Sequence, residues 1–304
     1  MSILAENFTM RFKEAITQIG QRGPSTILKK WSSNLKSNPM GGASSQGFVF
    51  LIGAGPGAAD LLTLKAYRAL QNADVILYDA LVSDEVVALF PTKPERIYVG
   101  KRFAQHSMSQ EDITALMLKL ALEGKQVVRV KGGDPAIFAR VGEECQALHK
   151  AGIQFCVVPG VTAASGASSY AGIPLTHRAC AQSVRFVTAH LKDAESEPDW
   201  ASMVPNENSK HGETLVFYMG LRRIQQICDR LTAHGMDPNM PVAVIEHATH
   251  QEQNVCIGTL KDIAEQVQIQ QIKGPAITIV GRVVEYRYAL TQVAQNADAE
   301  LLAI

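Results

Sequence analysis

The segment FVFLIGAGPG, residues 48–57, joins a continuous apolar run to a glycine-rich turn. Further apolar runs of strand length follow as far as Tyr170, and stretches with helical spacing separate them. Strands that are apolar throughout and alternate with helices are typical of a parallel sheet covered on both faces. We therefore expect strands at residues 48–52, 75–78, 97–99, 127–130 and 155–158, and helices at 61–71 and 110–123, the latter capped by Ser109 and ended by Gly124.

After Tyr170 the alternation becomes less regular. The run 254–258 follows the previous apolar run too closely for a helical crossover, so we expect an antiparallel hairpin there. The sequence thus predicts two α/β domains, the first (48–170) with a mainly parallel sheet and the second (171–290) with a mixed sheet. The second domain has strand candidates at 184–188, 214–218, 242–246, 254–258 and 276–280 and helix candidates at 221–233 and 260–268.

Other segments lack this pattern. Residues 1–47 are polar and end in a Gly/Ser-rich stretch, which predicts a flexible extension, and residues 291–304 form a tail. The polar segment 192–212, with Trp200, is expected on the surface.

Composition excludes several classes of protein. Among 304 residues, 29 Lys and Arg balance 29 Asp and Glu, so no global attraction to nucleic acid or to an anionic membrane is expected. No apolar run is long enough to span a membrane, and the first residues do not have the pattern of a secretion signal. The five cysteines are scattered and form no CxxC pair, which favours reduced thiols in a cytoplasmic protein.

The first glycine loop, residues 53–57, superficially fits a dinucleotide fingerprint, because Asp79 ends the next strand and could bind ribose hydroxyls. Pro56, however, removes a backbone donor, and the helix is delayed to about Leu61. Asp60 would suit the helix N-cap but would repel a phosphate. These features disfavour a NAD(P)-dependent oxidoreductase, which is one alternative, and a tight turn without a ligand is another.

Two further loops follow predicted strands. The second, KGGDP at 131–135, lets a ligand approach its backbone, and Asp134 can accept hydrogen bonds from hydroxyl or ammonium groups. Arg140 and Glu143 are expected to share a helical face just downstream, where a surface salt bridge would also explain them. The third loop begins at Pro159, continues into a helix of small residues, and reaches the basic end Thr176-His177-Arg178.

The three loops GAGPG, GGDP and PGVTAASGASSYAGIPLTHR, in this order and at this spacing, resemble the tetrapyrrole methylases over roughly residues 47–287. Segments such as YDALV at 78–82 and FYMG at 217–220 are most similar to its uroporphyrinogen-III C-methyltransferases. The resemblance implies methyl transfer from S-adenosyl-L-methionine (SAM) to C2 and C7 of uroporphyrinogen III, giving precorrin-2 and S-adenosyl-L-homocysteine. It also implies a homodimer with the active site in the interdomain cleft. Alternatives within this resemblance are methylation of a later corrin intermediate, diphthine synthesis, or a catalytically inactive SAM-binding regulator.

The same resemblance assigns residue roles. Asp79 and Lys101 would carry acid–base steps, and Arg140 and Arg178 would hold substrate carboxylates, since guanidinium binds carboxylate in a bidentate way. Glu143 would either orient Arg140 or act as a base. Ala248 lies in EHAT, where many members read ENGT, a change that a backbone contact would survive. The SAM contacts carried over are Pro56, Gly132, Gly133, Asp134, Ile137, Thr162, Ala163, Met219, Ala248 and Ala276.

No metal site is expected from the sequence. His247 and His250 could be taken for a pair of ligands, but no third ligand accompanies them.

Overall fold

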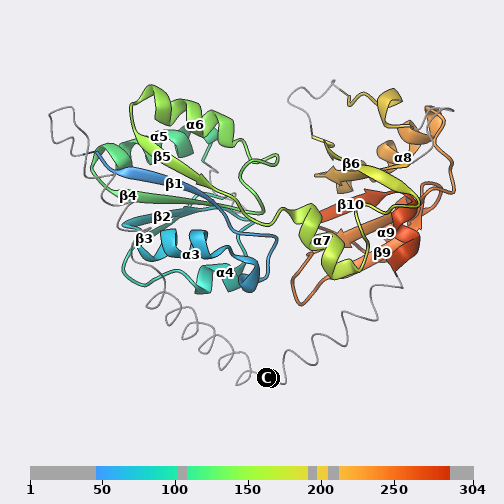
Figure 1. Cartoon of the computed structure of the whole chain (residues 1–304), viewed down its shortest axis with the longest axis horizontal. Helices are drawn as coiled ribbons and strands as arrows, with labels where there is room; N and C mark the ends of the chain where they lie inside the picture. Colours follow the sequence, from blue (N-terminus) through green and yellow to red (C-terminus); the bar gives the residue numbers. More distant parts are fainter. Residues whose placement is uncertain (1–45, 101–107, 191–196, 205–211, 288–304) are drawn as a thin grey trace, which may run out of the picture. The chain divides into compact units, whose positions relative to one another are not determined.

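A computed structural model describes residues 46–100, 108–190, 197–204 and 212–287 (Figure 1). Contacts divide the chain into two units, Met1–Ser44 and Ser45–Ile304, and every described residue belongs to the second. The extension up to residue 45, most of 192–212, the tail at 291–304 and Lys101 lie outside the described residues. No helix in the described ranges combines the length and the apolar character needed to cross a membrane.

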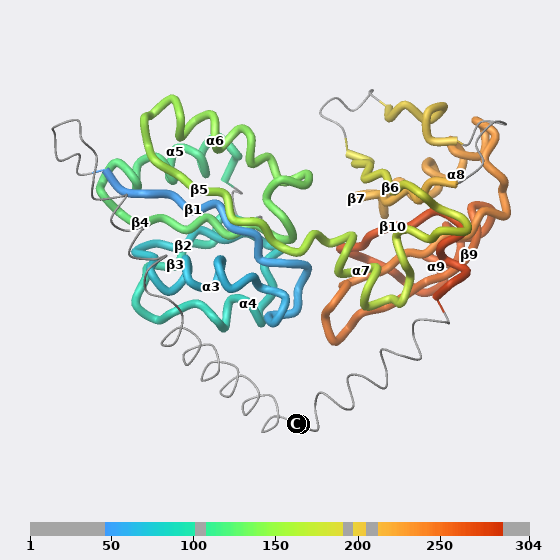
Figure 2. Tube along the Cα trace, viewed as in Figure 1, coloured from blue at the N-terminus to red at the C-terminus, as the bar shows by residue number. Residues whose placement is uncertain are grey.

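The first sheet is entirely parallel, as predicted. Its strand order is β3-β2-β4-β1-β5, so β4 lies at its centre, between β2 and β1. Figure 2 shows the backbone trace of these neighbouring strands. The strands are β1 (Phe48–Gly53), β2 (Val75–Tyr78), β3 (Glu95–Tyr98), β4 (Gln126–Lys131) and β5 (Gln154–Val158).

Helices cover both faces of this sheet, which confirms the layer arrangement (Figure 1). One apolar core joins the sheet to α3 (Leu64–Gln71) and α4 (Asp84–Ala88) through Leu70 and Val86. The other joins it to α5 (Gln110–Leu122) and α6 (Val141–Lys150) through Met117 and Leu148. Burial of such side chains is the main favourable contribution to folding of this part.

The second sheet is mixed, as predicted, with the order β6-β7-β10-β8-β9. Strands β6 and β7 are parallel, whereas the other pairs are antiparallel, and β8 with β9 forms the expected hairpin. The strands are β6 (Ala181–Thr188), β7 (Gly212–Tyr218), β8 (Pro241–Glu246), β9 (Asn254–Thr259) and β10 (Ala276–Val280).

Two apolar cores flank the second sheet as well. Helices α8 (Ile224–Ala233) and α9 (Ile263–Ile269) pack on one face through Leu231 and Ile263. Helix α7 (Ala163–Ala171) packs on the other through Ala167. The 3-10 turns are η1 (Ala59–Leu61), η2 (Ala201–Met203), η3 (Leu221–Arg223) and η4 (Arg282–Tyr286).

The predicted N-cap is confirmed for α5 and wrong for α3. Ser109 caps α5 in a reciprocal capping box with Asp112, and Gly124 follows the helix with φ +84°. Helix α3, by contrast, begins at Leu64 under Thr63, whose side chain accepts from Ala66 N, so Asp60 is not its N-cap. The preceding residues form η1 instead.

The prediction that Trp200 lies on the surface is wrong. Trp200 is buried, stacks on Phe217 and donates from Nε1 to Glu197 Oε2 at 2.8 Å. Met203, three residues later, is buried in the same core. A polar segment can thus insert one apolar pair into a core, because residues three apart share a helical face.

Candidate functional site

The three glycine loops meet at the carboxyl ends of β4, β1 and β5, which are adjacent in the first sheet. Gly55 N donates to Gly133 O at 3.2 Å, and Gly133 N donates to Gly55 O at 2.8 Å. A Cβ added at Gly53 would lie 2.5 Å from Gly133 O and 2.7 Å from Gly160 Cα. Glycine is required here because the loop backbones are in direct contact.

Asp134 ties the second loop to the third. Its Oδ1 accepts from Ala136 N at 2.8 Å, and its Oδ2 accepts from Gly160 N at 3.0 Å. Both carboxylate oxygens therefore already hold the loops in place, and each retains a further lone pair.

The second loop faces the start of α7 and the turn after β2. A Cβ at Gly133, where φ is +66°, would meet Ala163 N at 3.6 Å and Thr162 Cα at 4.0 Å. These are ordinary contact distances, so the space beside Gly133 is bounded by α7 but not filled by it. A Cβ at Gly132 would lie 2.6 Å from Leu81 Cβ, two residues after Asp79.

Tyr218, at the end of β7, connects the third loop to the second sheet. Its Oη lies 2.6 Å from Thr162 Oγ1 and accepts from Ala164 N at 3.1 Å. Burial raises the pKa of Tyr218, and the hydrogen bond with Thr162 opposes this only in part. Met219 follows directly with φ 57° and is 52% exposed, so its side chain is accessible beside this contact.

Other predicted cofactor residues surround the same region. A Cβ at Gly166 of α7 would lie 2.5 Å from Pro56 Cγ, so the proline ring packs against this helix. Ala58 N donates to Thr249 Oγ1 at 3.0 Å, which joins the first loop to the β8–β9 turn that contains Ala248.

The two remaining residues predicted to bind the cofactor belong to the second sheet or pack on it. Ile137 packs against the apolar core of α7. Ala276 opens β10, next to Ile277, which pairs with Tyr218. The structure therefore brings the second loop, with Gly133, against Thr162 and Ala163, and joins the first loop to α7 through Pro56.

Arg140 and Glu143 were expected to share a helical face, but Arg140 lies outside the helix, and the two residues form the surface salt bridge that was the alternative explanation. Arg140 occupies the N-cap of α6 with φ 57°, and Glu143 lies in the first turn. Arg140 Nε donates to Glu143 Oε1 at 2.8 Å, and Nη2 donates to Oε2 at 2.5 Å. This hydrogen bonding raises the pKa of Arg140. The guanidinium is about half exposed and keeps further donors for a ligand.

Arg178 is exposed in the segment between α7 and β6, without an ion pair to any described residue. Its guanidinium is therefore available to an anion. In the described ranges, no hydrogen bond or ion pair joins Arg178 to Arg140 or to the glycine loops. Within those ranges, no group of three or more His, Cys, Asp or Glu residues could hold a metal ion.

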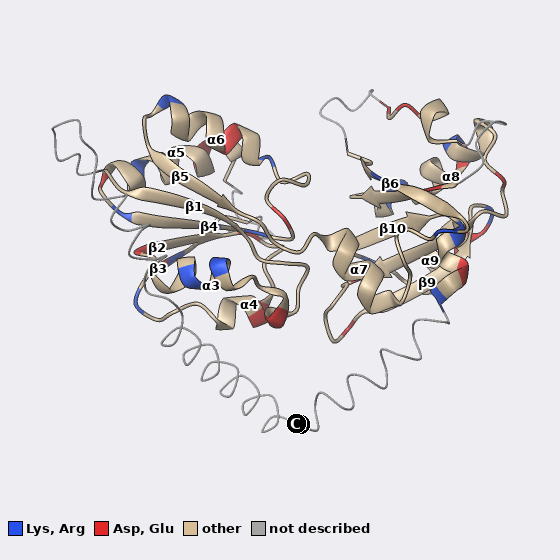
Figure 3. Cartoon of the chain, viewed as in Figure 1, with Lys and Arg blue, Asp and Glu red and all other residues tan. Residues whose placement is uncertain are grey.

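Asp79 belongs to a buried charge network that the sequence analysis missed. Arg129 Nη2 lies 3.0 Å from Asp79 Oδ2, and Lys131 Nζ lies 2.9 Å from Glu144 Oε2. Burial lowers the pKa of Lys131 most, Arg129 lowers it further, and Glu144 opposes both. A sequence signal did exist, since Arg129 and Lys131 are two apart in a central strand and so point to the same face. Figure 3 shows the acidic positions on α6, the helix that supplies Glu144.

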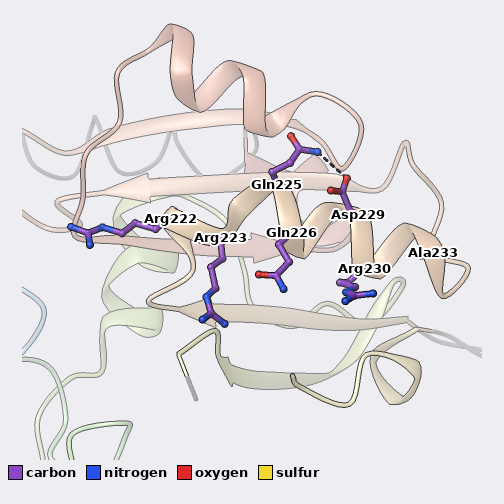
Figure 4. Close-up of a pocket in the computed structure, with 7 residues that line it drawn as sticks. All are labelled: Arg222, Arg223, Gln225, Gln226, Asp229, Arg230 and Ala233. Atoms are coloured by element: carbon purple, nitrogen blue, oxygen red, sulfur yellow. Dashed lines mark hydrogen bonds between the residues drawn. The ribbon is translucent and has the colours of Figure 1, made fainter. Parts of the chain in front are cut away.

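A separate depression runs along α8 (Figure 4). Two of its lining residues bind each other, since Gln225 Nε2 donates to Asp229 Oδ1 at 2.8 Å. A third, Arg230, donates from Nη2 to Glu197 Oε1 at 2.6 Å. None of the glycine loops contributes to it. The lining residues are Arg222, Arg223, Gln225, Gln226, Asp229, Arg230 and Ala233.

Comparison with known proteins identifies related sequences. The family model for the tetrapyrrole (corrin/porphyrin) methylases matches residues 49–264. A siroheme synthase of Acinetobacter baylyi is 54% identical over 245 residues, covering 81% of this chain and 52% of the relative. One of Azotobacter vinelandii is 51% identical over 254 residues, covering 83% and 54%. The chain thus spans about half the length of these curated relatives.

Two solved structures are similar to this chain in sequence and in fold. A uroporphyrin-III C-methyltransferase from Thermus thermophilus, complexed with S-adenosylhomocysteine, is 39% identical with a TM-score of 0.66, covering 79% of this chain and 99% of that one. A cobalt precorrin-4 methyltransferase is 28% identical with a TM-score of 0.69, covering 80% and 98%.

Proposed function

Because the chain belongs to the tetrapyrrole (corrin/porphyrin) methylases, we propose that it transfers methyl groups from SAM to C2 and C7 of uroporphyrinogen III, giving precorrin-2 by way of precorrin-1. The observation that carries this proposal is the junction of the three glycine loops with Thr162, Ala163 and the Tyr218–Met219 end of β7. The identity to siroheme synthases and to a uroporphyrin-III C-methyltransferase supports this choice of substrate.

The residues at this junction fit SAM. The cofactor would need a backbone-lined, largely apolar site, and a Cβ at Gly133 would enter the space bounded by Thr162 and Ala163. When bound, SAM would supply an electrophilic methyl group on a sulfonium. The chain's contribution would be to position it and to exclude water. We propose that the contacts come from Pro56, Gly132, Gly133, Asp134, Ile137, Thr162, Ala163, Met219, Ala248 and Ala276.

The substrate side would use charged residues. Uroporphyrinogen III carries eight carboxylates, and we assign Arg140 and Arg178 to bind some of them, because their exposed guanidinium groups suit bidentate contacts. The bidentate contact from Glu143 to Arg140 favours an orienting role for Glu143.

The proton lost by the methylated macrocycle needs an acceptor. We assign this role to Asp79, whose side chain is 25% exposed and can therefore reach a ligand. Lys101 lies outside the described residues, and its acid–base role rests on the family resemblance alone.

Two alternatives have less support. The first glycine loop does not open a helix, since α3 starts only at Leu64 under the Thr63 cap, so the loop lacks the helix N-terminus that a dinucleotide phosphate needs. A later corrin substrate has weaker support, because the cobalt precorrin-4 enzyme is 28% identical, against 39% for the uroporphyrin-III enzyme.

The wider setting follows from the same proposal. The product would serve siroheme, cobalamin or haem d1 synthesis, and the active form would be a homodimer of two α/β domains per chain, without nucleic-acid or membrane partners. All five cysteines are free thiols, which supports a cytoplasmic location.

The decisive experiment is to incubate the chain with SAM and uroporphyrinogen III under anaerobic conditions and to analyse the products by mass spectrometry. We expect one and then two added methyl groups. Methylation of a later corrin intermediate with no turnover of uroporphyrinogen III would overturn the substrate. A melting temperature raised by NAD(P)H and unaffected by SAM would overturn the enzyme class.

A further inference from the structure

The carboxylate of Asp79 is held at both oxygens. Its Oδ1 accepts from the backbone N–H of Leu81 at 3.1 Å, within its own turn. Its Oδ2 accepts from Arg129 Nη2 at 3.0 Å. The first contact is local, whereas the second comes from the neighbouring strand, where Leu77 of β2 pairs with Arg129 of β4. The orientation of the carboxylate therefore depends on Arg129.

Arg129 is itself fixed inside the protein. Its side chain is 3% exposed, and Nη1 donates to Val130 O at 2.8 Å. A buried guanidinium loses its hydration, and replacing such a pair with apolar residues is often neutral or stabilising. Stability of the sheet alone therefore does not account for an arginine at this position.

The other two charged residues, Glu144 and Lys131, determine which carboxylate forms the shorter ion pair with Arg129. Glu144 is fully buried and accepts from Lys131 Nζ at 2.9 and 3.0 Å and from Gln110 Nε2 at 3.0 Å. Its contact with Arg129 Nε is longer, at 3.5 Å. Lys131 thus pairs with both oxygens of Glu144, and Arg129 forms its shorter ion pair with Asp79. The two cations and two anions balance, so the arrangement leaves no net buried charge.

We propose that Arg129 is a positioning residue for methyl transfer, which holds the Asp79 carboxylate in the orientation that accepts a proton from the macrocycle. Glu144 and Lys131 support it by fixing the guanidinium. This inference rests on the proposed function, because it takes Asp79 as the proton acceptor. Arg129 touches neither substrate nor cofactor in this scheme and acts only through Asp79.

A double-mutant cycle with four forms tests the inference: wild type, Arg129→Met, Asp79→Asn and the double variant. Each is assayed for kcat and KM with uroporphyrinogen III, for S-adenosylhomocysteine affinity by calorimetry and for melting temperature. Arg129→Met is expected to lower kcat by ~10- to 100-fold, because a small displacement of a reacting group has effects of that size. The affinity for S-adenosylhomocysteine should change less than about threefold, and Arg129→Met should add less than about threefold loss to Asp79→Asn.

Two further variants are controls, one for the case that Arg129→Met does not fold and one for the effect of removing any strand arginine. Arg129→Lys keeps the cation and should fold, and we expect it to keep more kcat than Arg129→Met while remaining below wild type. Arg185→Met removes another strand arginine, paired with Glu213 at 3.0 Å in the second sheet, and should leave kcat unchanged.

The outcomes separate the two claims. Two results would overturn the role of Arg129: kcat losses of the two single variants that multiply in the double variant, or wild-type kcat in both Arg129 variants. In either case, methylation of uroporphyrinogen III by the wild-type chain would still support the proposed function. A wild-type chain that does not methylate uroporphyrinogen III would overturn the proposed function and, with it, this inference.

Discussion

Gly55 and Gly133 exchange two backbone hydrogen bonds, at 3.2 and 2.8 Å, across the carboxyl ends of the parallel strands β1 and β4. The bridge joins two loops that are far apart in the sequence and fixes the backbone of Gly133. As a result, the Cα of Gly133 faces the start of α7, where Thr162 and Ala163 lie. The proposed cofactor site is built on this relationship.

Gly133→Val should weaken binding of S-adenosylhomocysteine by on the order of tenfold or more, equivalent to about 1.4 kcal/mol or above. The added side chain would enter the space between the second loop and α7. Gly152→Val is the matched control, because Gly152 has φ +69° and no atom within 4 Å of an added Cβ. Both variants should lose stability from the positive φ, by about 1–2 kcal/mol. Calorimetry showing equal affinity losses in both would contradict the cofactor assignment.

Arg140→Ala and Arg178→Ala should each reduce kcat/KM by roughly 30- to 150-fold and leave cofactor affinity nearly unchanged. Losing one charge-assisted contact to a desolvated carboxylate costs about 2–3 kcal/mol, and a cation beside a sulfonium would be repelled. Arg222→Ala, on the α8 depression, is the control and should keep full activity. Steady-state kinetics and calorimetry check this, and loss of cofactor binding in both site variants would refute the division of roles.

Tyr218→Phe should lower the free energy of unfolding by about 1–3 kcal/mol near neutral pH, because Thr162 Oγ1 and Ala164 N lose a buried partner. It should also weaken cofactor binding several-fold through Thr162. Denaturant titration and calorimetry of the two forms measure these changes, and identical values in both would argue against the contact.

The same residue predicts a pH dependence. The pKa of Tyr218 is raised above its usual 10.0 in the folded state, chiefly by burial. The folded protein therefore keeps this proton at a pH where the unfolded chain loses it. The associated stabilisation is complete below pH 10 and is lost as the pH rises through the folded-state pKa. Tyr218→Phe should thus show a shallower loss of stability above pH 10, and parallel curves for the two forms would disprove it.

A chain that starts at Gln46 should retain most of its activity. The described sheets and every predicted site residue follow that position, and Gly47 N donates to Ala121 O at 2.7 Å. Turnover and melting temperature of this shorter form provide the check. A large loss of turnover with an unchanged melting temperature would reveal a catalytic role for the preceding residues.

The sequence predicted the strands well because apolar runs are a local signal. The sequence was insufficient where tertiary contacts determine which of several suitable residues takes a structural role. Asp60 and Thr63 are both suitable N-caps, but Thr63 Oγ1 also donates to Pro159 O of the third loop at 3.3 Å, which only the fold can reveal. The assignment of Asp79 came from a motif, whereas its partner Arg129 depends on strand order and on α6 supplying Glu144.

We propose that the junction of the three glycine loops is the methyl-donor site. A crystal structure of the chain with S-adenosylhomocysteine tests it most directly. We expect the ligand to lie against the backbone of Gly133, with Thr162 and Ala163 on its other side. Ligand bound elsewhere, for example in the α8 depression lined by Arg222 and Arg223, with the loop junction free, would contradict it.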